Sequence, residues 1–270
     1  MASETKASDP AAPGVALITG AARRIGRAIA LDLARDGWRI GVHYRRSRAE
    51  AETLVAEIRA LGSEAVAIPA DLADGDAAKA LVAGCRHAIG APTCLVNNAS
   101  EFLLDTVPTL DPDTWDKHLD INLKAPVFLA KELYLHLPEG VEGNVINIID
   151  QRVWNLTPEF FSYTISKAGL WTATRTLAQA LAPRVRVNAI GPGPVLASVH
   201  QTPAEFAAEC ASTLLGRGPR EEEIPATVRY ILSARSMTGQ MIALDGGQHL
   251  LWEGAENLTL RGRETAASKP

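Results

Sequence analysis

Short apolar runs alternate with longer helical patterns along the chain, and this alternation constrains the fold more than any other feature of the sequence. Strands joined through helices pair in parallel, and right-handed crossovers place those helices on both faces of the sheet. The pattern therefore predicts a single α/β domain over residues 14–250, with a doubly wound parallel sheet of about seven strands. The runs expected to form strands are Val15–Ile18, Arg39–Tyr44, Ala65–Pro69, Thr93–Val96, Val145–Ile149, Arg184–Ile190 and Gln240–Leu244.

Helical spacing fills the intervals between these strands. A long helix is expected over 113–137, with Asn122 in its middle. A mid-helix asparagine is usually a solvated residue, but it could also open a bend or hold a water that relays protons to Lys167. The other helices are expected up to about Arg35, over 49–61, from about 74 to 89, through Tyr163 and Lys167, over 203–214 and over 221–232.

Charge and composition exclude several classes of function. The net charge is −4, which argues against a nucleic-acid or anionic-membrane surface. No apolar run approaches the roughly 20 residues of a membrane span, and residues 1–13 lack the layout of a signal peptide, so a cytoplasmic protein is expected. We expect disorder in the tail 1–13. The three cysteines have unrelated spacings, which supports neither a disulfide framework nor a metal site: Cys85, Cys94 and Cys210.

A glycine-containing turn, Thr19–Gly26, follows the first predicted strand and leads into a helix. Gly20 and Gly26 let the turn close and let the helix N-terminus approach a ligand. The free N–H groups and the dipole at such an N-terminus favour a pyrophosphate. Arg24 occupies a position where such turns often have glycine.

Basic residues follow the second predicted strand. An acidic residue at its end would bind a ribose 2′-hydroxyl and repel a 2′-phosphate, but this chain has His43 followed by Arg45-Arg46-Ser47-Arg48. The sequence therefore favours NADP(H) over NAD(H), against the alternative of a solvated basic helix start. Asp71, after the third strand, would accept a hydrogen bond from the adenine amino group or cap the helix expected near Asp74.

Tyr163 and Lys167 are four residues apart and share one face of a predicted helix. An ammonium beside a phenol favours the phenolate, so we expect Lys167 to lower the pKa of Tyr163 and make it a general acid near neutral pH. The alternative is that Tyr163 and Lys167 are two unrelated residues on a helix surface. The pair gains weight because other polar or turn-forming residues end neighbouring strands, where parallel sheets bind ligands: Thr19, His43, Asp71, Asn98, Asp150 and Pro192.

These motifs resemble those of the short-chain dehydrogenases/reductases, from Val15 to about Leu250. The matching elements, in order, are Thr19-Gly20…Gly26, Asn97-Asn98-Ala99, Asn122, Tyr163-x-x-x-Lys167, Pro192-Gly193 and Asp245-Gly246-Gly247. Most members of that family have serine thirteen positions before the tyrosine, where this chain has Asp150. Asp150, Arg24, His43-Tyr44-Arg45-Arg46-Ser47 and Asn97–Phe102 are similar to the pteridine reductase and dihydromonapterin reductase branch.

The resemblance implies a Rossmann-type reductase that uses NADPH and acts on a small molecule. Arg46, Ser47 and His43 would hold the 2′-phosphate. The implied cofactor-binding residues are Gly20, Arg24, Ile25, His43, Tyr44, Arg46, Ser47, Asp71, Leu72, Asn98, Ala99, Ser100, Tyr163, Lys167, Pro192 and Gly193. The implied catalytic residues are Asn122, Asp150, Tyr163 and Lys167, and the implied substrate-binding residues are Arg24, Ser100, Phe102, Asp150 and Tyr163.

Three functional hypotheses follow. The first is an NADPH-dependent reductase of a dihydropterin or dihydrofolate-like ring, in which Phe102 stacks on the pterin and Asp150 binds its N–H edge. The second is a short-chain reductase of another carbonyl or imine, and the third is a non-catalytic NADP(H)-binding protein. Asp150 could instead be a helix N-cap, and Phe102 could be plain core packing.

The segment 195–220 is expected to cover the substrate, with His200 on the protein surface and Trp154 at the edge of the cleft. A tail is expected over 251–270. The resemblance also implies a homotetramer formed through two long helices.

Overall fold

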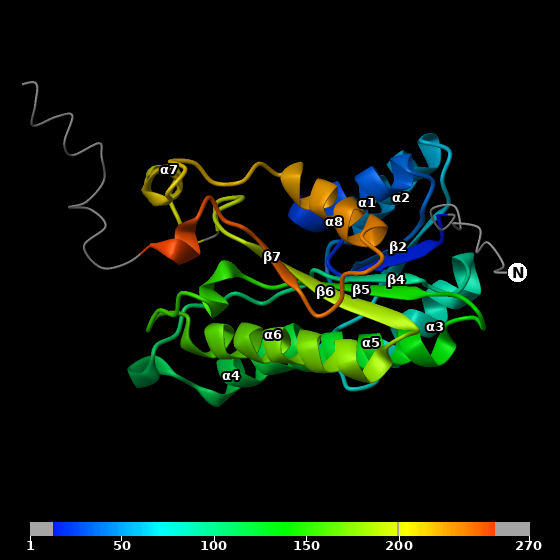
Figure 1. Ribbon diagram of the computed structural model, residues 1–270, viewed down its shortest axis with the longest axis horizontal. Coiled ribbons are helices and arrows are strands. Elements are labelled where there is room, and N and C mark those ends of the chain that lie inside the picture. Colours follow the sequence, from blue (N-terminus) through cyan, green and yellow to red (C-terminus); the bar gives the residue numbers. More distant parts are fainter. Residues whose placement is uncertain (1–12, 199, 252–270) are drawn as a thin grey trace, which may run out of the picture.

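Seven parallel strands form one sheet in the order β3-β2-β1-β4-β5-β6-β7, which confirms the doubly wound fold predicted from the sequence. The computed structural model describes residues 13–198 and 200–251 (Figure 1). The predicted tails 1–13 and 251–270 lie outside the described residues, apart from Pro13 and Leu251. The strands are β1 (Val15–Ile18), β2 (Arg39–Tyr44), β3 (Ala65–Pro69), β4 (Cys94–Asn97), β5 (Gly143–Ile148), β6 (Val185–Pro192) and β7 (Met241–Leu244).

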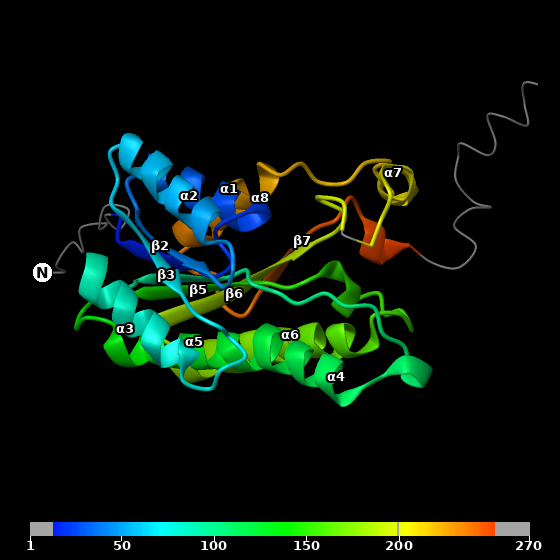
Figure 2. The same ribbon diagram turned by 180° about the vertical axis from the view of Figure 1, so that it is seen from behind.

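Helices cover both faces of the sheet (Figures 1 and 2). One face packs against α1 (Arg24–Arg35), α2 (Arg48–Ala60) and α8 (Glu223–Ser233). The other face packs against α3 (Ala77–Ile89), α5 (Ala125–His136) and α6 (Phe161–Leu181). The side chains of β1 alternate between the two cores, since Ala16 and Ile18 belong to the first and Val15 and Leu17 to the second.

Two shorter helices lie near the ends of strands. α4 (Pro112–Leu119) precedes α5, and α7 (Pro203–Ser212) lies at the end of the molecule opposite α3 (Figure 1). α7 begins with a capping box in which Thr202 and Glu205 bond to each other's backbone. Short 3-10 turns occur at Val107–Thr109, Gln151–Val153 and Gln248–Leu250.

The long helix predicted over 113–137 is present, but a π-helical turn, Asp120–Lys124, divides it into α4 and α5. Asn122 lies in this turn with a fully buried side chain that bonds outside its own helix. Its amide nitrogen donates to Glu101 O (3.0 Å) and Ser166 Oγ (3.1 Å). The sequence interpretation that Asn122 opens the helix fits this turn, and π turns of this kind often lie at functional sites.

Candidate active site

The turn after β1 is closed by contacts with the end of β4. Gly20 has φ +61°, and a Cβ there would lie 3.0 Å from Ala99 Cα, so glycine is required for both conformation and space. Thr19 Oγ1 accepts from Asn98 N and Ala99 N (2.9 Å each), and Asn98 Nδ2 donates back to Thr19 O (2.9 Å). These bonds join two strand ends that the sequence analysis assigned to one site.

The N-terminus of α1 follows this turn and is available to an anion. Arg23, the N-cap residue, makes no side-chain cap hydrogen bond, and the first turn has no acidic residue. A Cβ on Gly26 would collide with Gly20 O. The uncapped amides and the glycine-lined approach fit the pyrophosphate of a dinucleotide.

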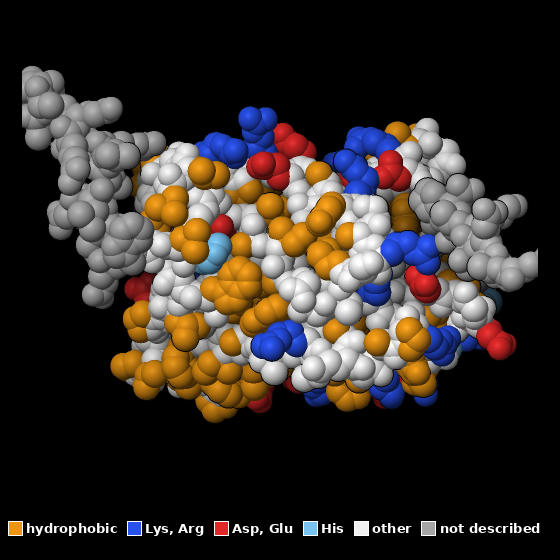
Figure 3. All heavy atoms as spheres, viewed as in Figure 1, with side chains coloured by type: hydrophobic (Ala, Val, Ile, Leu, Met, Phe, Trp, Pro, Cys, Tyr) orange, Lys and Arg blue, Asp and Glu red, His pale blue; other side chains and the backbone are white. Residues whose placement is uncertain are grey.

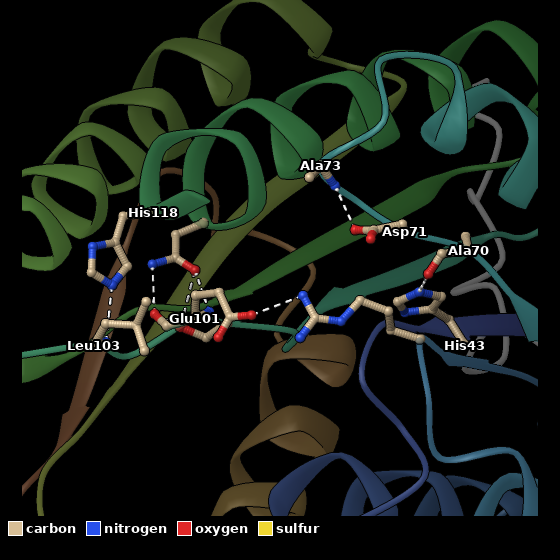
Figure 4. A network of polar contacts seen from close by, with 10 residues as sticks. His43, Ala70, Asp71, Ala73, Glu101, Leu103 and His118 are labelled. Atoms are coloured by element: carbon tan, nitrogen blue, oxygen red, sulfur yellow. Dashed lines mark hydrogen bonds and ion pairs between the residues drawn. The ribbon is translucent and has the colours of Figure 1, made fainter. Parts of the chain in front are cut away.

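His43 does not have the role expected from the sequence. Its Nδ1 accepts from Gly20 N (3.0 Å) and its Nε2 donates to Ala70 O (3.1 Å; Figure 4). The ring is 2% exposed, and burial lowers the pKa of His43 to about 4. The expectation that His43 holds a 2′-phosphate is therefore wrong, because the imidazole is neutral and both nitrogens hold backbone groups.

The basic residues after β2 lie at the surface, where a phosphate could reach them. Arg46 is exposed and Ser47 partly buried, and Ser47 makes no side-chain cap bond to α2. Arg45 forms an ion pair of 2.8 Å with Glu101, from the loop after β4.

The remaining predicted cofactor-binding residues near β2 and β3 include one exposed side chain and two buried ones. Asp71 is exposed, and its Oδ1 accepts from Ala73 N (3.1 Å), while α3 begins only at Ala77, so Asp71 does not cap that helix. The side chains of Tyr44 and Leu72 pack in the two cores.

Asp150 and Tyr163 form the centre of the predicted catalytic group. Tyr163 Oη donates to Asp150 Oδ2 at 2.9 Å. Asp150 also accepts from Arg152 N (2.8 Å), so it caps the 3-10 turn at Gln151–Val153 as well as facing Tyr163. Burial raises the pKa of Asp150 above its usual range.

Lys167 is adjacent to Tyr163 but does not activate it as the sequence suggested. Its Nζ donates to Ile148 O (2.9 Å) and lies 5.7 Å from the centre of the Tyr163 ring. Burial, together with the Asp150 carboxylate, raises the pKa of Tyr163 well above its usual value. The expected lowering of that pKa is wrong for this structure, since the nearest charge to the hydroxyl is negative. Burial lowers the pKa of Lys167 to about 8.

Phe102 contributes an aromatic surface beside Tyr163. The two ring centroids are 4.7 Å apart with an edge-to-face angle of 76°. Phe102 also stacks on Phe160 at 4.2 Å, so it packs within the protein while remaining partly buried. Ser100 Oγ bonds to Asn122 Oδ1 (3.1 Å), which places another predicted residue in the same loop.

The segment 195–220 contacts this site from two directions. Arg24 has φ +53°, the conformation that makes glycine usual there, and its guanidinium donates to Leu196 O (3.2 Å) and Ala197 O (3.0 Å). His200 is exposed, as expected, and its Nε2 also contacts Phe102 O at 3.0 Å. Trp154 is 42% exposed.

Pro192 and Gly193 follow the same edge of the sheet at the end of β6. A Cβ on Gly193 would lie 2.7 Å from Asp245 Cα, so only glycine lets this strand end pass the residue after β7. The structure therefore brings the two late motifs of the sequence together.

Several residues near the site had no signal in the sequence. Arg152 lies over the Phe160 ring, and Asp105, His118 and Ser162 form a buried hydrogen-bond network. Their partners are distant in the sequence, so no local pattern could identify them.

The doubly wound sheet, the glycine turn and the Tyr163–Lys167 pair define the class of α/β oxidoreductases. Within this class the chain belongs to the short-chain dehydrogenase family, whose model matches residues 14–206.

Two relatives show how the chain is related within the family. It is 32% identical to 3-oxoacyl-[acyl-carrier-protein] reductase FabG of Staphylococcus aureus, over 87% of this chain and 98% of the relative. It is 51% identical to FolM alternative dihydrofolate reductase 1 from Brucella canis, solved as a complex with NADP. That structure has a TM-score of 0.88, and the match covers 92% of this chain and 98% of the other. The Brucella suis protein of the same name, also solved with NADP, is 50% identical, with a TM-score of 0.84 and coverage of 90% and 98%.

Two further observations concern only the described part of the chain. It contains no helix long and apolar enough to cross a membrane. It also contains no group of three or more histidine, cysteine or acidic side chains arranged to hold a metal ion.

Proposed function

We propose that this protein is an NADPH-dependent reductase of a pteridine-like substrate, of the dihydropterin or dihydrofolate type. The observation that carries the proposal is the 2.9 Å contact between Asp150 and Tyr163, next to the partly buried ring of Phe102. A ketone offers only an acceptor, which a serine hydroxyl can polarise. The 2-amino-4-oxo edge of a pterin offers N–H donors, which suit a carboxylate.

Residues of this chain would hold NADPH along the carboxyl edge of the sheet. The α1 amides would receive the pyrophosphate, Arg46 and Ser47 the 2′-phosphate, and Asn98 and Ala99 the adenosine side. Tyr163 and Lys167 would bind the nicotinamide ribose. The bound cofactor supplies a hydride for the carbon of an electron-poor C=N bond.

Tyr163 would supply the proton that the substrate nitrogen gains. The raised pKa of Tyr163 keeps the phenol protonated at neutral pH, and the pKa of about 8 for Lys167 keeps most of that amine charged. Asp150 would orient the substrate edge and the Tyr163 hydroxyl together. Phe102 would support one face of the planar ring.

The surface around the site is compatible with a substrate that carries an apolar or aromatic ring. The loop before α4 exposes Leu104, Val107 and Leu110. Figure 3 shows hydrophobic side chains gathered at the lower left of the molecule, where α4 lies in Figure 1. The Brucella relatives, which share half of the sequence, are named dihydrofolate reductases, and this supports the same substrate class.

A second candidate is a reductase of another carbonyl or imine, favoured by the 32% identity with the 3-oxoacyl reductases. Asp150 argues against it, because a carboxylate repels the developing oxyanion of a ketone. A non-catalytic NADP(H)-binding role is the third candidate, and the presence of Asn122, Tyr163 and Lys167 argues against it. A homotetramer and a cytoplasmic location stay predictions.

Steady-state NADPH oxidation tests the proposal, with dihydrobiopterin, dihydromonapterin and dihydrofolate beside a panel of ketones and 3-oxoacyl thioesters. We expect turnover of the pteridines, and a loss in kcat of roughly 10²- to 10⁴-fold in Tyr163→Phe. Asp150→Ser should lose pteridine turnover while still binding NADPH. Turnover of ketones alone would support the second candidate, and NADPH binding without any turnover would support the third.

A further inference from the structure

Three side chains bond to the backbone of the loop that carries Phe102, and the side chain of Asp105 ties the loop to α6. Asn122 bonds to both backbone groups of Glu101, by accepting from its N (2.9 Å) and donating to its O (3.0 Å). The opposite side of Phe102 is held by His118, whose Nε2 accepts from Leu103 N at 3.1 Å (Figure 4). Further along, the Asp105 carboxylate accepts from Ser162 N (3.2 Å). His200 contacts Phe102 O itself.

His118 joins this loop to the helix that carries Tyr163. It is fully buried on α4, and its Nδ1 lies 2.6 Å from Ser162 Oγ. Because Nε2 accepts from Leu103, the neutral ring carries its proton on Nδ1 and donates it to Ser162 Oγ. Ser162 Oγ in turn donates to Asp105.

The network spans two groups that the proposed reaction needs in fixed positions. Ser162 immediately precedes Tyr163 in the first turn of α6, and Leu103 immediately follows Phe102. The rings of His118 and Tyr163 are in edge contact, with centroids 6.0 Å apart. Buried polar groups that are all satisfied hold a unique geometry, because breaking one bond leaves a donor or an acceptor unpaired.

We propose that His118 is a positioning residue that acts through Leu103 and Ser162 to set the spacing between the Phe102 ring and the Tyr163 hydroxyl. It thereby fixes where a planar substrate ring lies relative to its proton donor. The inference rests on the proposed function, since it assumes that Phe102 stacks on the substrate. It assigns a role to buried residues that the reaction itself does not use.

The role requires the neutral imidazole. A protonated His118 would present an N–H toward Leu103 N and break that bond. Burial and the Lys167 ammonium disfavour the cation and lower the pKa of His118, while the Asp105 and Glu101 carboxylates oppose this. The Tyr163 ring also packs against the imidazole of His118. The network therefore stays intact at neutral pH and is weakened in acid.

Two conservative variants separate the two bonds of His118. His118→Gln places an amide oxygen near the Nε2 position and retains the acceptor for Leu103. His118→Asn places its amide near the Nδ1 position and retains only the contact with Ser162. His87→Gln, on the exposed side of α3, is the matched control.

Steady-state kinetics with dihydropterin, KM for NADPH and melting temperature would be measured for each variant. We expect His118→Asn to raise KM for the pterin roughly 3- to 10-fold, the range expected for a weakened aromatic contact, with KM for NADPH unchanged. His118→Gln, which keeps the bond to Leu103 and loses the contact with Ser162, should show a smaller rise in KM for the pterin. In the wild type, KM for the pterin should rise in acid, below the pH at which an ordinary histidine titrates, and this rise should be absent in His118→Gln.

The other outcomes are distinguishable. If the wild type turns over the pterin and His118→Asn has an unchanged KM for it, the inference about His118 is overturned and the proposed function still stands. Equal losses of kcat and melting temperature in both variants, with KM unchanged, would also overturn it, because they indicate a purely structural role. If His118→Asn does not fold, the acid rise in wild-type KM and its loss in His118→Gln decide the question. No pterin turnover by the wild type would overturn the proposed function and the inference with it.

Discussion

The Tyr163 hydroxyl donates to the Asp150 carboxylate at 2.9 Å, at a position where most short-chain dehydrogenases have serine in place of the acid. Burial, together with this contact, raises the pKa of Tyr163, so the proton remains on the phenol at neutral pH. Burial lowers the pKa of the neighbouring Lys167 to about 8, which brings the titration of this ammonium close to neutral pH.

The first prediction concerns this lysine. We expect kcat/KM for the proposed substrate to fall as the pH rises through about 8, because Lys167 then loses the charge with which it would hold the nicotinamide ribose. A pH-rate profile measures this. Lys167→Arg keeps its charge at all these pH values, so its normalised profile should lose the falling limb. A falling limb at the same pH in the wild type and in Lys167→Arg would show that a group other than Lys167 causes it.

Arg24 provides the second prediction. Its left-handed backbone costs roughly 1 kcal/mol, and its guanidinium holds Leu196 and Ala197 of the covering segment. In Arg24→Gly the relief of strain should offset the lost bonds, so the free energy of unfolding should change by less than about 1 kcal/mol. Arg24→Ala keeps the strain and should be less stable than Arg24→Gly.

Both Arg24 variants should raise KM for the substrate, because the segment above the site is no longer held. Denaturant unfolding and steady-state kinetics measure the two effects, and Arg23→Ala is the control, since Arg23 is exposed and reaches Glu50 only at 3.9 Å. Greater stability of Arg24→Ala than of Arg24→Gly would contradict the role assigned to strain.

The third prediction concerns cofactor choice. Arg46→Ala should raise KM for NADPH roughly 5- to 150-fold and leave KM for NADH nearly unchanged, because a charged hydrogen bond to a phosphate contributes about 1–3 kcal/mol. Arg45 is already paired with Glu101, so Arg45→Ala should have the smaller effect. Equal changes with both cofactors would remove Arg46 from the 2′-phosphate site.

Acid stability provides the fourth prediction, through His43. The pKa of His43 is lowered from 6.5 to about 4, so between these pH values the unfolded chain binds a proton that the folded protein does not. Stability is therefore unaffected by this group above pH 6.5 and falls as the pH drops toward 4. The loss amounts to roughly 3 kcal/mol at the lower limit.

Denaturant unfolding at a series of pH values measures this loss. His43→Asn keeps an acceptor for Gly20 N but does not titrate, so its stability should depend less on pH across the same window. His87→Gln, which removes an exposed histidine, should leave the slope unchanged. Parallel slopes for the wild type and His43→Asn would show that His43 does not cause the acid loss.

Local pattern was sufficient for the fold and for the location of the site. The seven predicted strands agree with the observed ones to within two residues at each end, and the predicted parallel pairing follows from the helices between them. Because the carboxyl ends of parallel strands lie on one edge, the sequence also determined that Thr19, Asn98 and Asp150 lie at the same edge.

What those residues do depended on contacts that no local pattern contains. His43 bonds to a glycine 23 residues away, and Ser162 to an aspartate 57 residues away. The pKa of Tyr163 rises because folding buries it and places Asp150, rather than Lys167, against its hydroxyl. Secondary structure follows from the periodicity of side chains along the chain, whereas ionisation and hydrogen-bond partners follow from burial and from residues brought together only by the tertiary structure.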